Sequence, residues 1–317
     1  MLRPGAARAS LLASTSLSAT YPVAAKLIYA TDGAPLTPAV LTATRFALMA
    51  TVASLLLTPR LGGIAGEENP NRGFWVAAAE LGFWATAGAQ FNTAALQHVS
   101  VVRGTILLAS INILTPLFSV LIGSTDLQRQ VPLRVWLACA VALASTVYAL
   151  ADGASLPIGA TPGLLPGDEL MLGAATCYAI QQVRLSSLVM RHPAPLLAAA
   201  RLQTQAACSL AFLPFADGGG SVGSAIDLVT HVSATQAGLI GASALGAVVG
   251  LLLQYEGQAV INAPSAQPIY AASPIISAIW AYLVLNEPIS PSEVLGGAGI
   301  SAAALLAAGR SEATPRG

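Results

Sequence analysis

Residues 261–290 read INAPSAQPIYAASPIISAIWAYLVLNEPIS, and this stretch decides the fold class. It carries no charged residue from position 261 to position 285, which is long enough to cross a bilayer. Its first half contains Gln267 and Tyr270, and only after Pro274 does it become almost wholly apolar. Because the polar half is poorly suited to lipid, we expect a helix in the middle of a membrane bundle.

The composition of the whole chain agrees with a membrane protein. Of its 317 residues, 55% are hydrophobic and only 9% are charged, whereas a soluble domain is about one-quarter charged. The formal net charge is zero, which gives no indication of nucleic acid or of an acidic partner. The three cysteines and three histidines lie far apart, so we expect no disulfide framework, no metal site and no cofactor.

Hydropathy and the polar segments between apolar runs divide the chain into ten candidate membrane spans. They cover residues 10–30, 38–57, 74–95, 99–123, 133–151, 169–189, 195–215, 235–256, 261–285 and 290–309. Several connections are short, which favours antiparallel neighbours. The fold class we predict is an all-α integral membrane protein with ten transmembrane helices.

The two halves of the chain share features at matching positions. Arg45 and Arg201 each lie about two turns into spans two and seven, and Pro116 and Pro274 precede the apolar halves of spans four and nine. Five crossings return a chain on the opposite face of the membrane, so such repeats must be inverted. The predicted divisions are a first five-helix repeat, a linker and a second five-helix repeat, at residues 10–151, 152–167 and 168–309.

Loop charges predict the orientation in the membrane. One side carries Arg3, Arg8, Arg60, Arg72, Arg129, Arg134, Arg191, Arg310 and Arg316. The opposite loops after spans five, seven and nine carry no lysine or arginine, with Lys26 and Arg103 as exceptions near span ends. The positive-inside rule therefore predicts that both termini are cytoplasmic. A plasma or bacterial inner membrane is favoured, with a plastid envelope as the alternative, and residues 10–30 are expected to be a retained helix rather than a transit peptide.

The chain resembles the EamA-type transporters of the drug/metabolite transporter superfamily over about residues 10–309. The resemblance rests on the two arginines, on the run ALQHVSVVRGT at 95–105, on the closing run 285–288 (LNEP) and on the glycines of 296–299. One departure is that the first half has Gln-Arg-Gln at 128–130 where the second half has Glu287. The resemblance implies transport of small metabolites such as amino acids, nucleobases, amines or sugar conjugates.

Seven polar residues within the spans are candidate substrate contacts: Arg45, Glu80, Asn92, Asn112, Arg201, Gln267 and Tyr270. An intramembrane arginine must face a cavity, pair or snorkel, so Arg45 and Arg201 could also be structural. Glu80 could pair with Arg45, lie at a solvated helix end or carry a proton. The amides could be interhelical hydrogen-bonding groups instead.

These observations favour a secondary transporter, not an enzyme, that moves a small polar or amphipathic metabolite by alternating access through a central cavity between the repeats. The alternatives are a non-transporting membrane scaffold or receptor, and a membrane-embedded enzyme. The expected partners are a small-molecule metabolite and the lipid bilayer, without nucleic acid, and a homodimer is left open.

Overall fold

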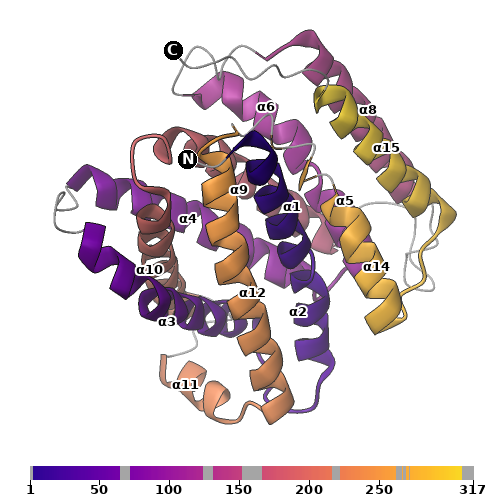
Figure 1. The fold of residues 1–317 in the computed structure, drawn as a ribbon. Coiled ribbons are helices and arrows are strands. Elements are labelled where there is room, and N and C mark those ends of the chain that lie inside the picture. The colour runs from indigo at the N-terminus through magenta and orange to yellow at the C-terminus, as the bar shows by residue number, and fades with distance from the viewer. Residues whose placement is uncertain are drawn as a thin grey trace.

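The computed structural model describes residues 3–64, 72–123, 131–151, 166–215, 222–261, 266, 269–270 and 272–308, and all its regular elements are helices (Figure 1). The helices are α1 (Pro4–Ser18), α2 (Tyr21–Ala30), α3 (Pro38–Ile64), α4 (Arg72–Ala95), α5 (Val101–Leu108), α6 (Ile111–Ile122), α8 (Leu133–Ala151), α9 (Pro166–Leu188), α10 (Ala194–Phe212), η2 (Leu213–Phe215), α11 (Val222–Thr230), α12 (Ala234–Gln258), α14 (Ser273–Leu285) and α15 (Pro291–Ala308). Four segments of the described chain are long and apolar enough to cross a membrane: Pro38–Leu55, Val101–Ile122, Ala194–Phe215 and Ala234–Gln258.

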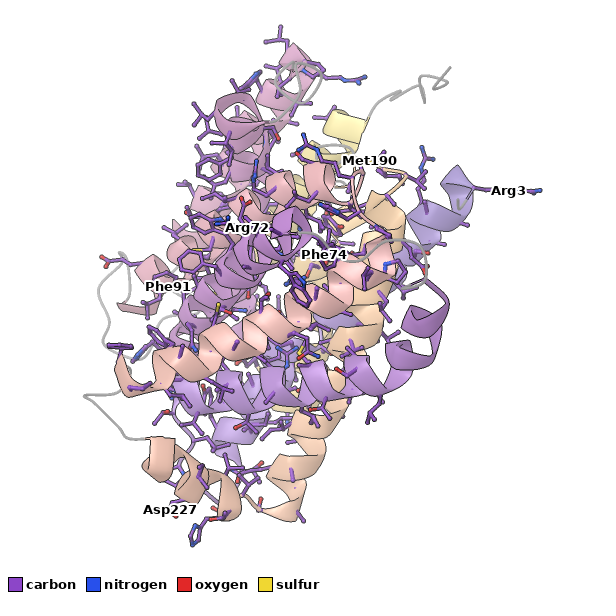
Figure 2. All side chains as sticks on the ribbon, turned by 90° about the vertical axis from the view of Figure 1, so that its left-hand side faces the viewer. Arg3, Arg72, Phe74, Phe91, Met190 and Asp227 are labelled. Atoms are coloured by element: carbon purple, nitrogen blue, oxygen red, sulfur yellow. The ribbon has the colours of Figure 1, made fainter. Side chains whose placement is uncertain are left out.

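The helices occupy the ten predicted spans. Span one consists of α1 and α2, span four of α5 and α6, and span nine continues as α14. One expectation was wrong: the segment after span seven was predicted to be a loop, but it contains the short helix α11. Figure 2 shows that Asp227, on α11, and Arg3, before α1, lie toward opposite ends of the molecule. Most of the predicted linker lies outside the described residues.

The breaks within spans one and four have local causes. Pro22, at the second position of α2, has no N–H to bond the carbonyl of Ser18, so the helix cannot continue unbroken through this point. Ser277 Oγ donates a hydrogen bond of 2.8 Å to the carbonyl of Ala19 at this break. In span four the break is a tight turn of the 3₁₀ type. The N–H of Ser110 donates a hydrogen bond of 3.0 Å to the carbonyl of Leu107, three residues earlier.

The packing of the helices repeats when the two halves are exchanged. Spans one and eight meet through α1 and α12, as spans six and three do through α9 and α4. Spans seven and three meet through α10 and α4, as spans two and eight do through α3 and α12. The pairs two–seven (α3, α10), four–nine (α5, α14) and five–ten (α8, α15) are their own counterparts, and α8 and α15 run side by side at one edge of Figure 1. This symmetry is that of two inverted five-helix repeats.

Small residues allow the paired helices to approach closely. A Cβ atom added to Gly82 of α4 would lie 2.3 Å from Thr204 Oγ1 of α10. A Cβ on Gly296 of α15 would lie 2.3 Å from Ala149 Cβ, and one on Gly299 would lie 2.2 Å from Ser145 Oγ, both on α8. Gly296 and Gly299 therefore serve the contact between spans five and ten.

A buried ion pair joins the two repeats. Arg103 of α5 donates to Asp168 in the first turn of α9, with Nε–Oδ1 at 2.9 Å and Nη2–Oδ2 at 2.6 Å. The two side chains are 2% and 0% exposed. The pair explains why Arg103 can lie on the side of the molecule whose loops otherwise lack basic residues.

A second contact between the repeats involves Glu287, in the turn between α14 and α15. Its Oε2 accepts a hydrogen bond of 2.9 Å from the N–H of Val101, the first residue of α5, and so caps that helix. Burial raises the pKa of the Glu287 carboxyl above its usual value, although nearby Lys26 and the N–H groups of Val101 and Val102 act in the opposite direction. Glu287 thus lies close to Lys26, which with Arg103 is one of the two exceptions to the pattern of loop charges.

Replacing Asp168 with Asn should destabilise the protein strongly, because the change leaves the Arg103 guanidinium buried without its counter-charge. Loss of one partner of a buried pair costs about 3–5 kcal/mol. The measurement is the thermal unfolding temperature of the purified protein in detergent. Glu169→Gln is the matched control, since Glu169 is the exposed neighbour in the same helical turn and its loss should change stability by about 0.5 kcal/mol or less. Equal unfolding temperatures for the two variants would contradict the structural role of the pair.

Candidate functional site

A cavity with a volume of ≈ 280 Å³ lies between the two repeats. Its lining comes from spans one to four and six to nine, whereas α8 and α15 contribute nothing to it. Five of the predicted site residues line it: Arg45, Asn92, Asn112, Arg201 and Tyr270. Among the described residues that line this cavity there is no aspartate or glutamate, so its two formal charges are both positive.

Arg45 enters the cavity from α3. Its side chain is 8% exposed, and its guanidinium carbon lies 4.0 Å from the centroid of the Tyr21 ring, which is a cation–π contact. The Nε atom of Arg45 is buried without a hydrogen-bond acceptor. The tyrosine therefore compensates part of the charge but leaves this N–H donor unsatisfied.

Arg201 enters from α10, the counterpart of α3 in the second repeat. It is 7% exposed, and its guanidinium carbon lies 5.9 Å from the centroid of the Tyr255 ring of α12. Both Nε and Nη1 of Arg201 are buried without an acceptor. The two arginines that the repeat pattern paired in the sequence thus meet at one cavity, each beside an aromatic ring.

Glu80 does not line the cavity. It lies on α4 and accepts hydrogen bonds from Arg184 of α9, with Nη2–Oε2 at 2.9 Å. Both side chains are 29% exposed, so this pair lies near the boundary of the bundle. The suggestion that Glu80 pairs with Arg45 was wrong, because the acid is engaged by Arg184.

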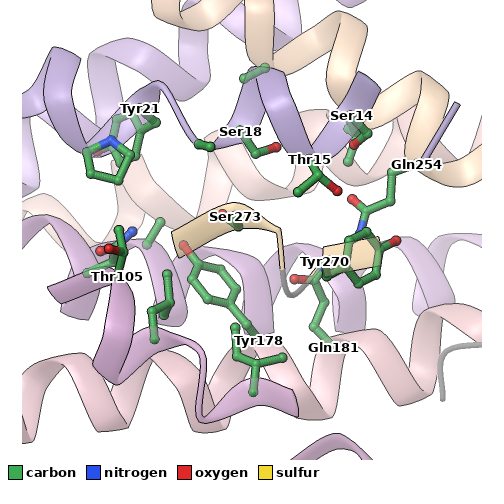
Figure 3. A pocket seen from close by; sticks show the side chains of 18 of the residues that line it. Ser14, Thr15, Ser18, Tyr21, Thr105, Tyr178, Gln181, Gln254, Tyr270 and Ser273 are labelled. Atoms are coloured by element: carbon green, nitrogen blue, oxygen red, sulfur yellow. The ribbon is translucent and has the colours of Figure 1, made fainter. Parts of the chain in front are cut away.

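A cluster of amides surrounds Tyr270 at one end of the cavity. Gln258 Nε2 donates to the hydroxyl of Tyr270 at 3.0 Å and to Gln182 Oε1 at 2.7 Å. Figure 3 shows Gln181 and Gln254 on either side of Tyr270. Gln267, another of the candidate substrate contacts, lies outside the described residues.

Sequence reasoning missed the contribution of span six. Tyr178, Gln181 and Gln182 all line the cavity from α9, and Figure 3 shows the Tyr178 ring extending into it. Their spacing of three and four residues places them on one face of a helix, and this is the signal that could have found them. Gln205, one turn after Arg201 on α10, was also missed.

Three prolines leave backbone carbonyls without a helical partner around the cavity. Pro22, Pro116 and Pro274 have no N–H, so none of them can bond the carbonyl four residues earlier in the chain. Those carbonyls belong to the cavity-lining residues Ser18, Asn112 and Tyr270. The Asn112 carbonyl is 4.0 Å from Cys139 Sγ of α8, which is a weak donor. Discontinuous helices with such groups commonly surround the solute site of secondary transporters.

Comparison with known protein families finds a match in the second half of the chain. Residues 165–309 match the model of the EamA-like transporter family. The chain therefore carries an EamA-like transporter family domain. This domain is part of the drug/metabolite transporter superfamily, which is a group of transporters and not of enzymes, and the protein is a multi-pass integral membrane protein.

A solved structure shows the same fold over the whole chain. The crystal structure of another protein aligns with this chain at a TM-score of 0.63 and 19% sequence identity. The alignment covers 96% of this chain and 96% of the chain in the crystal structure. No curated protein matches the chain in sequence. The all-helical architecture of ten spans in two inverted repeats, predicted from the sequence, is confirmed.

Replacing Gly88 with Ala should disturb the cavity. A Cβ at this position of α4 would lie 2.7 Å from Cε1 of Tyr178, so the ring would have to move. We expect reduced solute binding, measured as a smaller thermal shift with any solute that stabilises the unaltered protein. Gly246→Ala on α12 is the control, because no atom lies within 4 Å of its added Cβ and the change should leave binding intact. Unaltered binding by Gly88→Ala would argue that Tyr178 does not shape the site.

Proposed function

We propose that this protein is a secondary transporter that moves a small polar or amphipathic metabolite by alternating access. The observation that carries the proposal is the cavity between the repeats, because both repeats supply equivalent buried arginines to it. A site shared by two inverted repeats becomes accessible from either side when one repeat rocks against the other. A scaffold has no need of such a buried polar site, and a receptor site does not require matching contributions from two inverted repeats.

The contacts at one end of the bundle support this mechanism. Asp168–Arg103 and Glu287–Val101 both join the first repeat to the second. With both termini cytoplasmic, as the loop charges predict, these contacts lie at the outer end of the molecule. Rocking of the repeats would have to break or rearrange them, so they are suited to hold the outer side closed while the cavity communicates with the inside.

The boundaries of the two repeats, the cytoplasmic placement of the termini and the choice of membrane remain parts of this proposal. The match at residues 165–309 supports a second repeat that starts close to the predicted residue 168.

Counterflow in proteoliposomes tests the proposal. Vesicles loaded with an unlabelled solute should accumulate the labelled solute transiently above equilibrium, since a carrier exchanges one molecule for another. The panel would contain amino acids, nucleobases, amines, organic acids and sugar phosphates, with protein-free vesicles as the control. Flux without counterflow would indicate a channel, and no flux for any solute with folded protein would contradict the transporter function.

Replacing Glu80 with Gln should leave the pH profile of counterflow unchanged. Glu80 is outside the cavity and is paired with Arg184, so its carboxylate is poorly placed to exchange a proton in step with solute binding. The measurement is the initial counterflow rate from about pH 5 to pH 8, a range in which a coupling carboxylate with a raised pKa would titrate. Arg184→Gln, which removes the other partner, should show the same profile. A flattened profile in Glu80→Gln alone would instead assign the coupling proton to this residue.

A further inference from the structure

We infer that the cavity selects small organic solutes that carry an oxyanion, either a carboxylate or a phosphate ester. The inference rests on the proposed transport function and specifies its substrate class. Two buried arginines face the site, and no acid among the described residues lining it balances them. Burying a guanidinium is costly unless it meets an acceptor or a counter-charge, so the charge balance points to an anionic ligand.

Three acids of the described chain, Glu80, Asp168 and Glu287, are engaged elsewhere. Glu80 is held by Arg184, and Asp168 is held by Arg103. Glu287 accepts a hydrogen bond from the N–H of Val101 at the start of α5. Neither Arg45 nor Arg201 has an ion pair with any of them, which distinguishes these two side chains from Arg103 and Arg184.

The contact of Arg45 with Tyr21 leaves hydrogen-bonding capacity unused. The guanidinium carbon lies 4.0 Å from the centroid of the ring, and a cation–π contact with a ring face satisfies none of the five N–H donors. The buried Nε of Arg45 and the buried Nε and Nη1 of Arg201 have no acceptor. Carboxylate and phosphate oxygens match the planar array of these donors better than any neutral group.

The rest of the lining favours an organic anion over an inorganic one. Met49, Leu108 and Leu251 supply apolar surface, and the amides beside Tyr270 can donate and accept hydrogen bonds. A small anion such as free phosphate would leave this surface unused. A cationic amine would face two positive charges without a carboxylate to bind it.

The equivalent origin of the two arginines gives the anion a role in the transport cycle. Arg45 belongs to the first repeat and Arg201 to the second, so one bound anion can attract both halves at once. An anion that interacts more strongly with one relative position of the halves than with the other shifts their equilibrium. A neutral solute of the same shape lacks this interaction with the guanidinium groups.

The first experiment uses the unaltered protein and matched probes. Thermal shift and counterflow are measured with succinate and glycerol 3-phosphate, with the neutral succinamide and glycerol, with putrescine, and with inorganic phosphate at constant ionic strength. Stabilisation and counterflow by succinate or glycerol 3-phosphate, but not by their neutral analogues or putrescine, are expected, and the two arms show which oxyanion is preferred. Equal responses to neutral analogues, a preference for putrescine, or a response to inorganic phosphate alone would overturn the inference.

The second experiment uses arginine variants. Arg45→Gln and Arg201→Gln should each weaken the apparent affinity for the effective anion by about tenfold or more, since each removes a charge-assisted contact. Arg191→Gln is the control, because this exposed arginine lies in the turn before α10 and should have no effect. If the Gln variants fail to fold, Arg45→Lys and Arg201→Lys retain the charge and should still prefer anions, with weaker binding because the planar donor array is lost. Unchanged affinity in the folded variants would overturn the role of the arginines.

The outcomes separate this inference from the proposed function. Counterflow of a neutral or cationic solute alone would leave the transporter proposal intact and remove the anion preference. Absence of flux for the whole panel with folded protein would count against transport itself, and the thermal shifts would then decide whether the cavity binds anions.

Discussion

The absence of water from the interior of a membrane bundle is the constraint on which this structure depends. Every buried charge must then find a partner, a cavity or the membrane surface. Four arginines of the described spans use three solutions. Arg103 is neutralised by Asp168, Arg184 pairs with Glu80 near the boundary, and Arg45 and Arg201 lie against aromatic rings at the central cavity. Only the last solution places cations without a carboxylate partner in the lining of the cavity, which is why the cavity and not an ion pair marks the site.

The two repeats share their packing but not their charges. Asp168 lies in the first turn of α9, whereas α1, the corresponding helix of the first repeat, contains no aspartate or glutamate. In the same way, Glu287 has no acidic counterpart at 128–130. The ion pair and the capping carboxylate therefore occur at one end of the bundle only. Two inverted repeats with identical sequences would close both ends with equal free energy, so under the proposed alternating access these differences favour closure of this end.

The architecture could be predicted from the sequence because membrane spans are long and their repetition is visible in single residues. Arg45 and Arg201 occur at the same depth in their spans, and this register was enough to place both at one site. The breaks inside spans one and four were not predicted. Hydropathy averages over a whole span, whereas a break depends on local groups such as Pro22 or the tight turn at Ser110.

The partners of the charged residues were harder to predict than the positions of these residues along their spans. The sequence suggested Arg45 as the partner of Glu80. In the structure α9 packs against α4, and Arg184 of α9 pairs with Glu80 instead. Asp168 was missed as a partner because it stands 65 positions from Arg103 in the chain, next to a linker. Pairing across an inverted repeat depends on the rotation of each helix about its axis, and single residues in an apolar sequence define this rotation poorly.

The residues most useful for recognising the family are structural in this chain. Glu287 caps α5, while Gly296 and Gly299 allow α8 to pack closely against α15. None of the three lines the cavity, whereas Tyr270, earlier in the same stretch, does. Contacts of this kind hold helices together and do not depend on which solute occupies the cavity. Under the proposed transport function, substrate choice is instead expected to depend on the polar residues that α3, α9, α10 and α12 contribute to the cavity.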